Sequence, residues 1–258
     1  AIHMVKDHMC IFLDASSTAY TLGMKLTGFT ELTVITNGID LALALKDIPG
    51  ITVILTGGIV TSASSSIEGL LGVDLLQKIH TDIAFVSARG FSVENGLTDF
   101  SIYEADLKRM CIKASAKTIA LIDHTKFDTS SISSYASIDD LNLVITDSGL
   151  SENTKEIYKI IEEIEKRYNQ DLTLEIIAEQ FHFHPNSLSR LFKRQTTISF
   201  YQYLQKIRLK HAYYDLIHTN MKIIDIALNH GFKNVKSFEN VFKKEYHTTP
   251  TKYRKVNN

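Results

Sequence analysis

The chain has 258 residues, of which 44% are hydrophobic, 22% charged and 9% aromatic, a composition typical of a globular protein and not of a disordered or fibrous one. No stretch approaches the roughly 18 consecutive apolar residues of a membrane-spanning helix, and the N-terminus lacks the pattern of a secretory signal. We therefore expect a cytoplasmic protein, of one large or two ordinary domains, that does not contact a membrane.

Cysteine and histidine spacing gives no support for a metal site. The chain has two cysteines, Cys10 and Cys111, which are too few and too far apart for a disulfide framework or a zinc cluster. His182 and His184 lack further ligands at a suitable spacing, so we expect them to cap or support a helix. The sequence predicts no metal and no cofactor.

Charge is distributed unevenly along the chain. Residues 1–150 hold 10 basic and 17 acidic side chains, a net charge of −7, whereas residues 151–258 hold 18 and 12, a net charge of +6. This asymmetry is typical of a basic module that binds nucleic acid, joined to an acidic module that avoids polyanions. A basic surface is, however, often only exposed to solvent. We expect two domains, residues 1–150 and 151–258.

Strand and helix patterns alternate through residues 1–150. Continuous apolar, β-branched runs, typical of strands buried on both faces of a parallel sheet, cover residues 11–14, 32–36, 51–56, 83–87, 118–123 and 141–146. Helical patterns lie between them, over residues 17–26, 39–46, 67–80 and 105–116. This alternation predicts right-handed βαβ units with helices on both sides of one sheet.

Small and polar residues gather where the predicted strands end, which is the edge at which open α/β sheets bind ligands. After the first strand, residues 14–18 open a helix whose free N–H groups and dipole attract an anion. Taken singly, each of these residues is explained by turn chemistry or helix capping. Together they predict an anion pocket, formed by Asp14, Ser16, Ser17, Thr18, Asn37, Gly57, Gly58, Arg89 and Lys126.

A series of short motifs occurs in a fixed order in this half. The motifs are Ile11-Phe12-Leu13-Asp14, Ser16-Ser17-Thr18, Thr36-Asn37, Gly57-Gly58, Gly96-Leu97-Thr98, Glu104 with Lys108-Arg109, and Asp123-His124-Thr125-Lys126-Phe127. By this order, residues 2–147 resemble the effector-binding domain of DeoR-type transcriptional regulators, whose fold is shared with ribose-phosphate isomerases. That family normally carries a winged helix-turn-helix before this domain, and residues 1–8 resemble the connection to one.

The resemblance implies a sugar-phosphate pocket. Ser16, Ser17 and Thr18 would hold the phosphate with the help of Lys126. Asp14, Arg89 and Glu104 would line the sugar end. Ala15 stands where the family usually has glycine, and Arg89 where it usually has a small acid or amide, so we expect a sugar different from those familiar in the family.

Helical periodicity replaces the strand pattern from Ser151 onward. Isoleucines between residues 157 and 164 form the stripe of an amphipathic helix, which is explained by packing or by a dimerising coiled coil. Two similar helix-turn-helix units follow, joined by a predicted helix over residues 199–218. At 1.5 Å per residue this connector spans about 30 Å, close to the roughly 34 Å between successive major grooves on one face of DNA.

Each unit ends in a helix with an apolar inner face, anchored by Leu188 and Phe192 in the first and by Phe238 and Phe242 in the second. The outer faces combine amide, hydroxyl and cationic groups, which suit base edges and phosphates. A solvated helix has a similar face, so the argument depends on there being two such helices. The predicted DNA contacts are Asn186, Ser189, Arg190, Lys193 and Arg194, then Val235, Lys236, Ser237, Glu239, Asn240, Lys243 and Lys244.

A second series of motifs covers this half. It consists of Leu188-Ser189-Arg190-Leu191-Phe192-Lys193, Tyr203-Leu204, Arg208-Leu209, Ile226-Ala227, Gly231-Phe232, Phe242-Lys243 and Thr249-Pro250-Thr251-Lys252-Tyr253-Arg254. By these motifs, residues 157–254 resemble the DNA-binding domain of AraC-type regulators. The resemblance implies that the outer faces of both helices enter the major groove. Thr197 and His247 stand where that family usually has glycine, after each of these helices.

The expected fold is an α/β parallel-sheet sensor domain, similar to ribose-phosphate isomerases, followed by an all-α double helix-turn-helix domain. The favoured function is a DNA-binding transcriptional regulator that responds to a phosphorylated sugar or a related small anionic metabolite. An isomerase-like enzyme activity is the alternative, with Glu104 or Asp14 as general base and Lys126 as electrostatic partner. A third hypothesis makes the first domain only an oligomerisation scaffold. The expected partners are double-stranded DNA, a sugar phosphate and further copies of the chain in a homo-oligomer.

Overall fold

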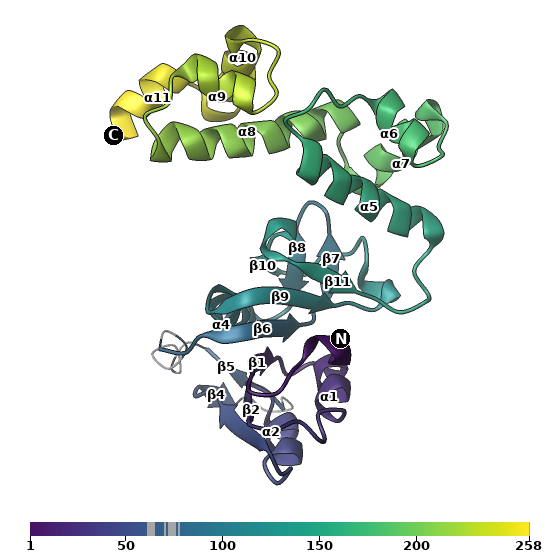
Figure 1. The fold of residues 1–258 in the computed structure, drawn as a ribbon, viewed down its shortest axis with the longest axis vertical. Coiled ribbons are helices and arrows are strands. Elements are labelled where there is room, and N and C mark those ends of the chain that lie inside the picture. Colours follow the sequence, from purple (N-terminus) through teal and green to yellow (C-terminus); the bar gives the residue numbers. More distant parts are fainter. Residues whose placement is uncertain (61–64, 70, 72–75, 77, 258) are drawn as a thin grey trace. The chain divides into compact units, whose positions relative to one another are not determined.

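The computed structural model describes residues 1–60, 65–69, 71, 76 and 78–257. It divides the chain into two compact units, Ala1–Leu150 and Ser151–Asn258 (Figure 1). All strands lie in the first unit, and the second is built from helices. The predicted fold class, a parallel α/β domain followed by an all-α helix-turn-helix domain, is confirmed. Among the described residues, no helix combines the length and the apolar character needed to span a membrane.

Six parallel strands form the main sheet of the first unit, in the order β11-β9-β6-β1-β2-β3. Their bounds are β1 Cys10–Leu13, β2 Leu32–Thr36, β3 Ile51–Leu55, β6 Thr81–Val86, β9 Ser115–Leu121 and β11 Leu143–Ile145. The chain adds β2 and β3 on one side of β1, and then β9 and β11 on the far side of β6. The direction in which strands are added therefore reverses between the neighbours β1 and β6.

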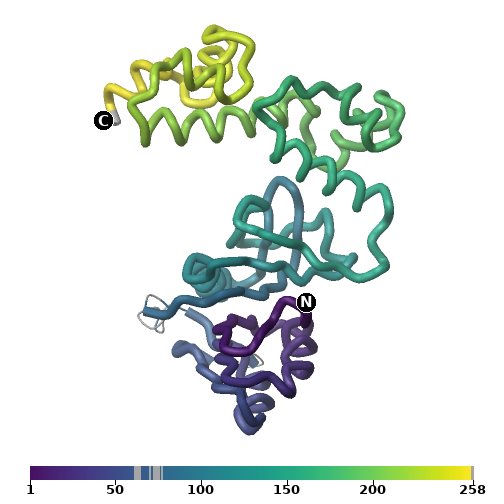
Figure 2. The backbone as a smooth tube through the Cα atoms, in the orientation of Figure 1, coloured from purple at the N-terminus to yellow at the C-terminus, as the bar shows by residue number. Residues whose placement is uncertain are grey.

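Helices cover both faces of this sheet. Helices α1 (Ser17–Gly23) and α2 (Ile39–Leu45) pack on the face that carries Ile11 and Leu13 of β1. Phe12 points to the other face, where it borders the same small interior space as Cys111 of α4 (Ile102–Lys113). The purple-to-blue part of the trace in Figure 2 follows the first of these βαβ units.

Two smaller antiparallel sheets were not predicted. One has the order β10-β8-β7, with β7 Gly90–Ser92, β8 Gly96–Asp99 and β10 Ser133–Ala136, and the other pairs β4 Ile59–Val60 with β5 Ile67–Glu68. The β10-β8-β7 sheet needs a glycine at Gly96. The φ of this residue is +61°, and a Cβ there would lie 2.0 Å from the carbonyl oxygen of Ala136. These short strands contain glycine, serine or charged residues, or only two apolar residues, and so lack the continuous apolar run by which the strands of the main sheet were predicted.

Several predicted boundaries were wrong. The helix expected over residues 67–80 begins instead as strand β5, and residues 70, 72–75 and 77 lie outside the described part of the chain. Helix α4 begins at Ile102 because the Ser101 hydroxyl caps it, accepting from the Glu104 N–H at 3.3 Å. It ends before Ala116, which belongs to β9. Burial on both faces was also wrong for the edge strands β3 and β11, which expose Leu55 and Leu143.

Seven helices build the second unit: α5 Glu152–Arg167, α6 Leu174–Gln180, α7 Pro185–Thr196, α8 Phe200–His218, α9 Ile223–Asn229, α10 Val235–Tyr246 and α11 Pro250–Asn257. The isoleucine stripe of α5 is buried inside this unit, so packing explains it and the coiled-coil interpretation does not. The α6–α7 pair contacts α8 near its start, and α9 and α10 contact its later part (Figure 1). With 19 residues, α8 is about 28 Å long.

Candidate functional site

A cavity of about 380 Å³ opens at the edge of the sheet where the strand order reverses. The loops that follow β1 and β6 leave the sheet in opposite directions there, which is the usual ligand position in an open α/β sheet. Its lining residues are Ala15, Ser16, Ser17, Ser65, Ser66, Ser87, Ala88, Arg89, Asp99, Glu104, Lys108 and Lys126.

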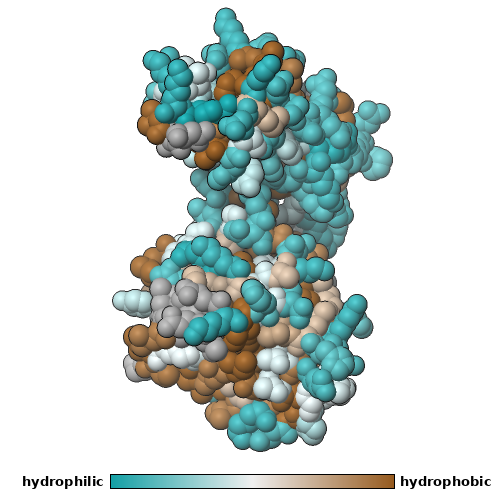
Figure 3. Space-filling view, turned by 60° about the vertical axis from the view of Figure 1, so that its left-hand side comes forward, coloured by the Kyte–Doolittle hydropathy of each residue, from teal (hydrophilic) through white to brown (hydrophobic). Residues whose placement is uncertain are grey.

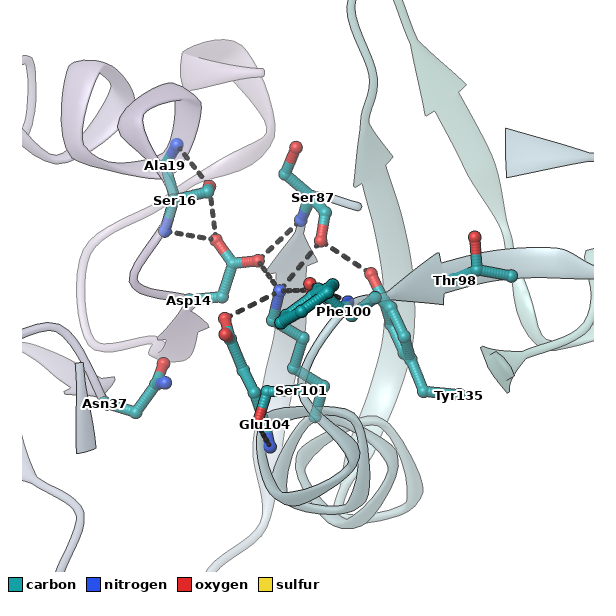
Figure 4. A network of polar contacts seen from close by, with 12 residues as sticks. Asp14, Ser16, Ala19, Asn37, Ser87, Thr98, Phe100, Ser101, Glu104 and Tyr135 are labelled. Carbon is teal, nitrogen blue, oxygen red and sulfur yellow. Dashed lines mark hydrogen bonds and ion pairs between the residues drawn. The ribbon is translucent and has the colours of Figure 1, made fainter. Parts of the chain in front are cut away.

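The loop after β1 is held by the Asp14 carboxylate, which is completely buried. Its Oδ1 accepts from the N–H of Ser16 at 3.1 Å and from the Ser16 hydroxyl at 2.5 Å, and its Oδ2 accepts from the Ser87 N–H at 2.7 Å. The Ser16 Oγ also accepts from the Ala19 N–H at 3.1 Å and so caps α1 (Figure 4). Asp14 thus lies behind the cavity wall and fixes the loop that lines it.

Ala15 does not need glycine's conformational freedom at this point. Among the described residues, those with a positive φ include several non-glycine residues but not Ala15. The alanine therefore fits the loop without backbone strain. Its Cα lies 3.1 Å from where a Cβ on Gly38 would stand, so it is Gly38 that permits the close approach of the two loops.

Lys108 lies at the centre of a buried cluster of carboxylates. Its Nζ is 2.7 Å from Asp99, 3.1 Å from Glu104 and 3.2 Å from Asp14, and it donates to the Ser87 carbonyl oxygen at 3.0 Å. Burial alone lowers the pKa of Lys108, but the carboxylates, Asp14 above all, raise it well above its ordinary value. The lysine is therefore charged and joins α4 to the ends of β1, β6 and β8.

Glu104 faces the cavity from the first turn of α4 (Figure 4). Burial raises the pKa of this carboxyl, an effect that Lys108 partly opposes and that the negative charges of Asp99 and Asp14 reinforce. The Tyr135 hydroxyl donates to the Ser87 carbonyl oxygen at 2.6 Å, the same oxygen that Lys108 contacts. Carboxylates on this side of the cavity can accept hydrogen bonds from ligand hydroxyl groups.

Two cations, Arg89 and Lys126, line the same cavity and can attract an anion. Arg89, after β6, is exposed and forms no ion pair within the part of the chain that the structure describes. Lys126 lies 3.3 Å from Asp123, so its charge is partly compensated. A hydrogen bond from the Thr125 hydroxyl, more than this lysine, lowers the pKa of Asp123. Arg89 is thus the stronger candidate for holding an anion.

The structure brings together some of the residues predicted for the pocket and separates others. Ser16, Ser17, Arg89, Glu104 and Lys126 line the cavity, whereas Asp14, Thr18, Asn37, Gly57 and Gly58 are not among its lining residues.

Two of the separated residues have structural roles. Asn37 is buried, and its Nδ2 donates to the Ile67 carbonyl oxygen at 3.2 Å, which anchors β5. A Cβ on Gly58 would lie 2.4 Å from the Glu68 carbonyl oxygen, so a glycine there lets β4 approach β5.

Sequence reasoning missed three buried polar residues of the cavity wall, Lys108, Asp99 and Ser87. Lys108 was part of a recognised motif, and its spacing of one helical turn from Glu104 was a signal that the two side chains meet. Ser87 is a small polar residue at the end of a predicted strand, and that position is the signal by which Arg89 and the other pocket residues were selected. Asp99 had no such signal, because strand β8 itself was not predicted.

The two recognition helices of the second unit, α7 and α10, are built alike. His184 caps α7 through Nδ1, which accepts from the Asn186 N–H at 3.3 Å, and Pro185 occupies the first helical position. Asn234 caps α10 by accepting from the Ser237 N–H at 2.9 Å. His184 therefore has a capping role, and among the described residues no group of three or more potential metal ligands occurs.

Side chains on the outer faces of these helices reach solvent. The inner faces bury Leu188 and Phe192 in α7, and Phe238 and Phe242 in α10. Exposed on the outer faces are Asn186, Arg190, Lys193, Arg194, Lys236, Asn240, Lys243 and Lys244, while Ser189, Val235, Ser237 and Glu239 are half-buried. Hydrophilic residues cover much of the face of this unit that Figure 3 shows. Both helices can therefore contact a partner.

Not every cation of the second unit is available to a partner. Arg208 of α8 donates to the carbonyl oxygens of Tyr168 and Gln170, both at 2.7 Å. Arg254 of α11 donates to those of Leu216 at 2.9 Å and Met221 at 2.6 Å. These two arginines fix the loops around α8.

The residues after the recognition helices adopt the left-handed conformation that glycine favours. Thr197 has φ +62° and His247 has φ +57°. Each helix thus ends with the same geometry although neither has glycine, and the strain is of the order of 1 kcal/mol per residue.

Two family models match this chain. The model of the DeoR C terminal sensor domain matches residues 1–148, more than half of the chain. The chain belongs to this family. A model described as a helix-turn-helix domain matches residues 177–256, so the resemblances to a DeoR-type sensor and an AraC-type DNA-binding domain are both confirmed.

Curated relatives of the chain are named as regulators. The HTH-type transcriptional regulator GolR of Listeria innocua serovar 6a is 50% identical over 159 residues, which is 62% of this chain and 61% of that relative. The uncharacterized HTH-type transcriptional regulator YulB of Bacillus subtilis is 40% identical over 150 residues, 58% of each chain. The chain thus spans about three fifths of the length of these relatives.

Among solved structures, the C-terminal domain of AraT, a response regulator from Geobacillus stearothermophilus, is 34% identical, with a TM-score of 0.39 over 41% of this chain and 88% of that one. The family models thus describe a sensor domain and a helix-turn-helix domain, and the curated relatives above are named as transcriptional regulators.

Proposed function

We propose that the chain is a DNA-binding transcriptional regulator whose first unit senses a phosphorylated sugar or a related small anionic metabolite. The observation that carries the proposal is the pair of exposed, cation-bearing helices α7 and α10 in a chain that also holds a sensor domain. A helix with amide, hydroxyl and cationic groups on one face suits the major groove, where bases present donors and acceptors.

The length of α8 supports simultaneous binding of both helices. Its span of about 28 Å is comparable with the roughly 34 Å between successive major grooves on one face of the duplex. We infer that α7 and α10 enter neighbouring major-groove segments. Lys193, Arg194, Lys243 and Lys244, in the later turns of the two helices, then contact phosphates.

The chemistry of the cavity supports a phosphorylated sugar. A volume of about 380 Å³ is in the range of small-molecule sites. The Ser17 hydroxyl, with Arg89 and Lys126, can bind an anion, while Glu104 can accept hydrogen bonds from sugar hydroxyls. A ligand with a phosphate at one end and hydroxyl groups at the other matches this division.

An isomerase-like activity is less well supported. A general base must be free to accept a proton, but Glu104 forms an ion pair with Lys108, and Asp14 is buried with its oxygens engaged by Ser16, Ser87 and Lys108. Lys126, the proposed electrostatic partner, already pairs with Asp123. Incubation with aldose and ketose phosphates, followed by proton exchange, should show no turnover.

We also propose that the protein acts in the cytoplasm as a homo-oligomer. The first unit exposes large apolar side chains, including Phe100, Ile102 and Tyr103 at the start of α4 and Ile59 and Val60 of β4. Brown hydrophobic areas are visible on this unit in Figure 3. Exposed apolar surface of this kind favours contact between copies, and the molecular mass in solution tests it.

Two measurements test the proposed function. A panel of sugar phosphates should contain a compound that raises the melting temperature, because a ligand bound only by the native state stabilises it. A domain that serves only as a scaffold would show no such shift. Duplex binding should weaken steeply with salt, with a slope of log K against log salt of about −0.9 per phosphate contact. An affinity that barely changes between low and moderate salt would refute DNA binding.

A further inference from the structure

Helices α7 and α10 present equivalent positions with different side chains. Both have 12 residues, and both are followed by a residue in the left-handed conformation. Leu188 and Phe192 therefore correspond to the buried Phe238 and Phe242. By the same register, Ser189 corresponds to Glu239, and Arg190 to Asn240. The two helices share one backbone frame but carry different chemistry at the outward positions.

Glu239 of α10 lies between two lysines on the surface of its helix. Lys236 and Lys243 lie one turn before and after it on the same helix, yet none of the described cations lies within ion-pair distance of its carboxylate. Elsewhere in this unit such spacings do give pairs, as between Glu162 and Lys166 at 2.6 Å. Its carboxylate, half-buried at the surface, thus has an unfilled capacity to accept hydrogen bonds.

A carboxylate at this position restricts what the helix can bind. Phosphate groups repel it, and the acceptor groups of guanine and thymine cannot pair with it. The exocyclic amino group of cytosine donates into the major groove and is the natural partner of Asp and Glu side chains. Arg190 has the fork of donors that matches the O6 and N7 acceptors of guanine, and Asn240 has the amide that matches N7 and the amino group of adenine.

We propose that the two recognition helices bind unlike base sequences, with Arg190 selecting guanine in one segment and Glu239 and Asn240 selecting cytosine and adenine in the other. This inference rests on the proposed function, since it requires both helices to lie in the major groove. The preferred DNA site of one chain is therefore asymmetric, being neither a direct repeat nor a palindrome. Glu239 contributes specificity and not affinity, because its charge opposes the phosphates.

The test is selection of preferred sites from a randomised duplex library by the full chain and by Glu239→Gln. Removal of the charge should raise the affinity for unrelated duplexes, while glutamine, which matches adenine, should shift the preference at one base pair away from cytosine. The discrimination at that base pair should change by about 5-fold to 150-fold. Glu245→Gln, the same change at an exposed residue near the end of α10, should leave the preferred sequence unchanged.

The outcomes distinguish a failure of the base assignments from a failure of DNA binding itself. A cytosine preference that Glu239→Gln removes and Glu245→Gln retains supports the inference. An unchanged preferred sequence in Glu239→Gln, or a wild-type site made of two identical halves, overturns the inference but leaves DNA binding intact. A wild-type chain that selects no sequence and binds without salt dependence overturns the proposed function itself.

Discussion

The ammonium of Lys108 lies 2.7 Å from the carboxylate of Asp99, and both side chains are buried. This ion pair joins α4 to the end of β8, and the same ammonium reaches Asp14 at the end of β1. One lysine therefore holds together the strand end and the helix that form the cavity wall. The cluster contains three carboxylates for one ammonium, so its stability depends on that cation.

Replacement of Lys108 by methionine should destabilise the first unit by about 3–5 kcal/mol, because it leaves buried carboxylates without a counter-charge. The loss should be smaller at pH 4 than at pH 7, because burial raises the pKa of Glu104 and protonation of this carboxyl removes one of the uncompensated charges. Denaturant unfolding at both pH values measures it. Lys113→Met, on the exposed side of the same helix, is the matched control and should cost little. Equal effects of the two substitutions would contradict this role of Lys108.

Glu104→Gln should stabilise the first unit at neutral pH by about 1 kcal/mol. Burial raises the pKa of Glu104, so this carboxyl binds its proton more tightly in the native state than in the unfolded chain. Its contribution to stability is present below the pKa of the unfolded chain and is lost as the pH rises through the native pKa. Glutamine avoids that loss.

The difference in unfolding free energy between Glu104→Gln and the wild type should therefore grow as the pH rises from about 4 to 7. Glu94→Gln, at an exposed position, should show no such trend. A difference for Glu104→Gln that is constant across this range would show that the carboxyl does not titrate abnormally.

The sequence predicted the main sheet and the positions of both recognition helices, because long apolar runs and periodic stripes reflect burial directly. It did not predict the cluster around Lys108. That cluster depends on β8, which has no continuous apolar run, and on a lysine whose burial is possible only because three acids surround it.

Asn37 has a structural contact that the sequence did not predict. Its position at a strand end suggested a ligand contact, but its side chain hydrogen-bonds the main chain of β5. Strand ends need such anchors as well as binding groups, and residue type alone does not distinguish the two uses.

Ser17→Asp should abolish the melting-temperature rise that a sugar phosphate produces, because it places a carboxylate beside the expected position of the phosphate. Ser17 is exposed at the start of α1, so the ligand-free melting temperature should change little. Thr27→Asp, which adds the same charge at an exposed site away from the cavity, should keep the full ligand-induced rise. A Ser17→Asp variant that still responds fully would place the anion elsewhere.

Arg190→Ala and Lys243→Ala should weaken DNA binding in different ways. Loss of Arg190 should relax base preference at a cost of about 1–3 kcal/mol for the preferred site. Loss of Lys243 should weaken binding to all sequences alike and reduce the salt slope by about one phosphate contact. Titration of preferred and scrambled duplexes with each variant separates the two effects. The reverse pattern would show that the assignments of base and phosphate contacts are exchanged.

The central claim is that α7 and α10 bind neighbouring major-groove segments at the same time. The most direct test compares the affinity of the full chain for its selected duplex with its affinity for the same duplex carrying a half-turn insertion of about 5 base pairs between the two segments. The insertion moves one segment to the opposite face of the DNA, so we expect the affinity to fall to that of a duplex with a single segment. Equal affinity for both duplexes would contradict the claim.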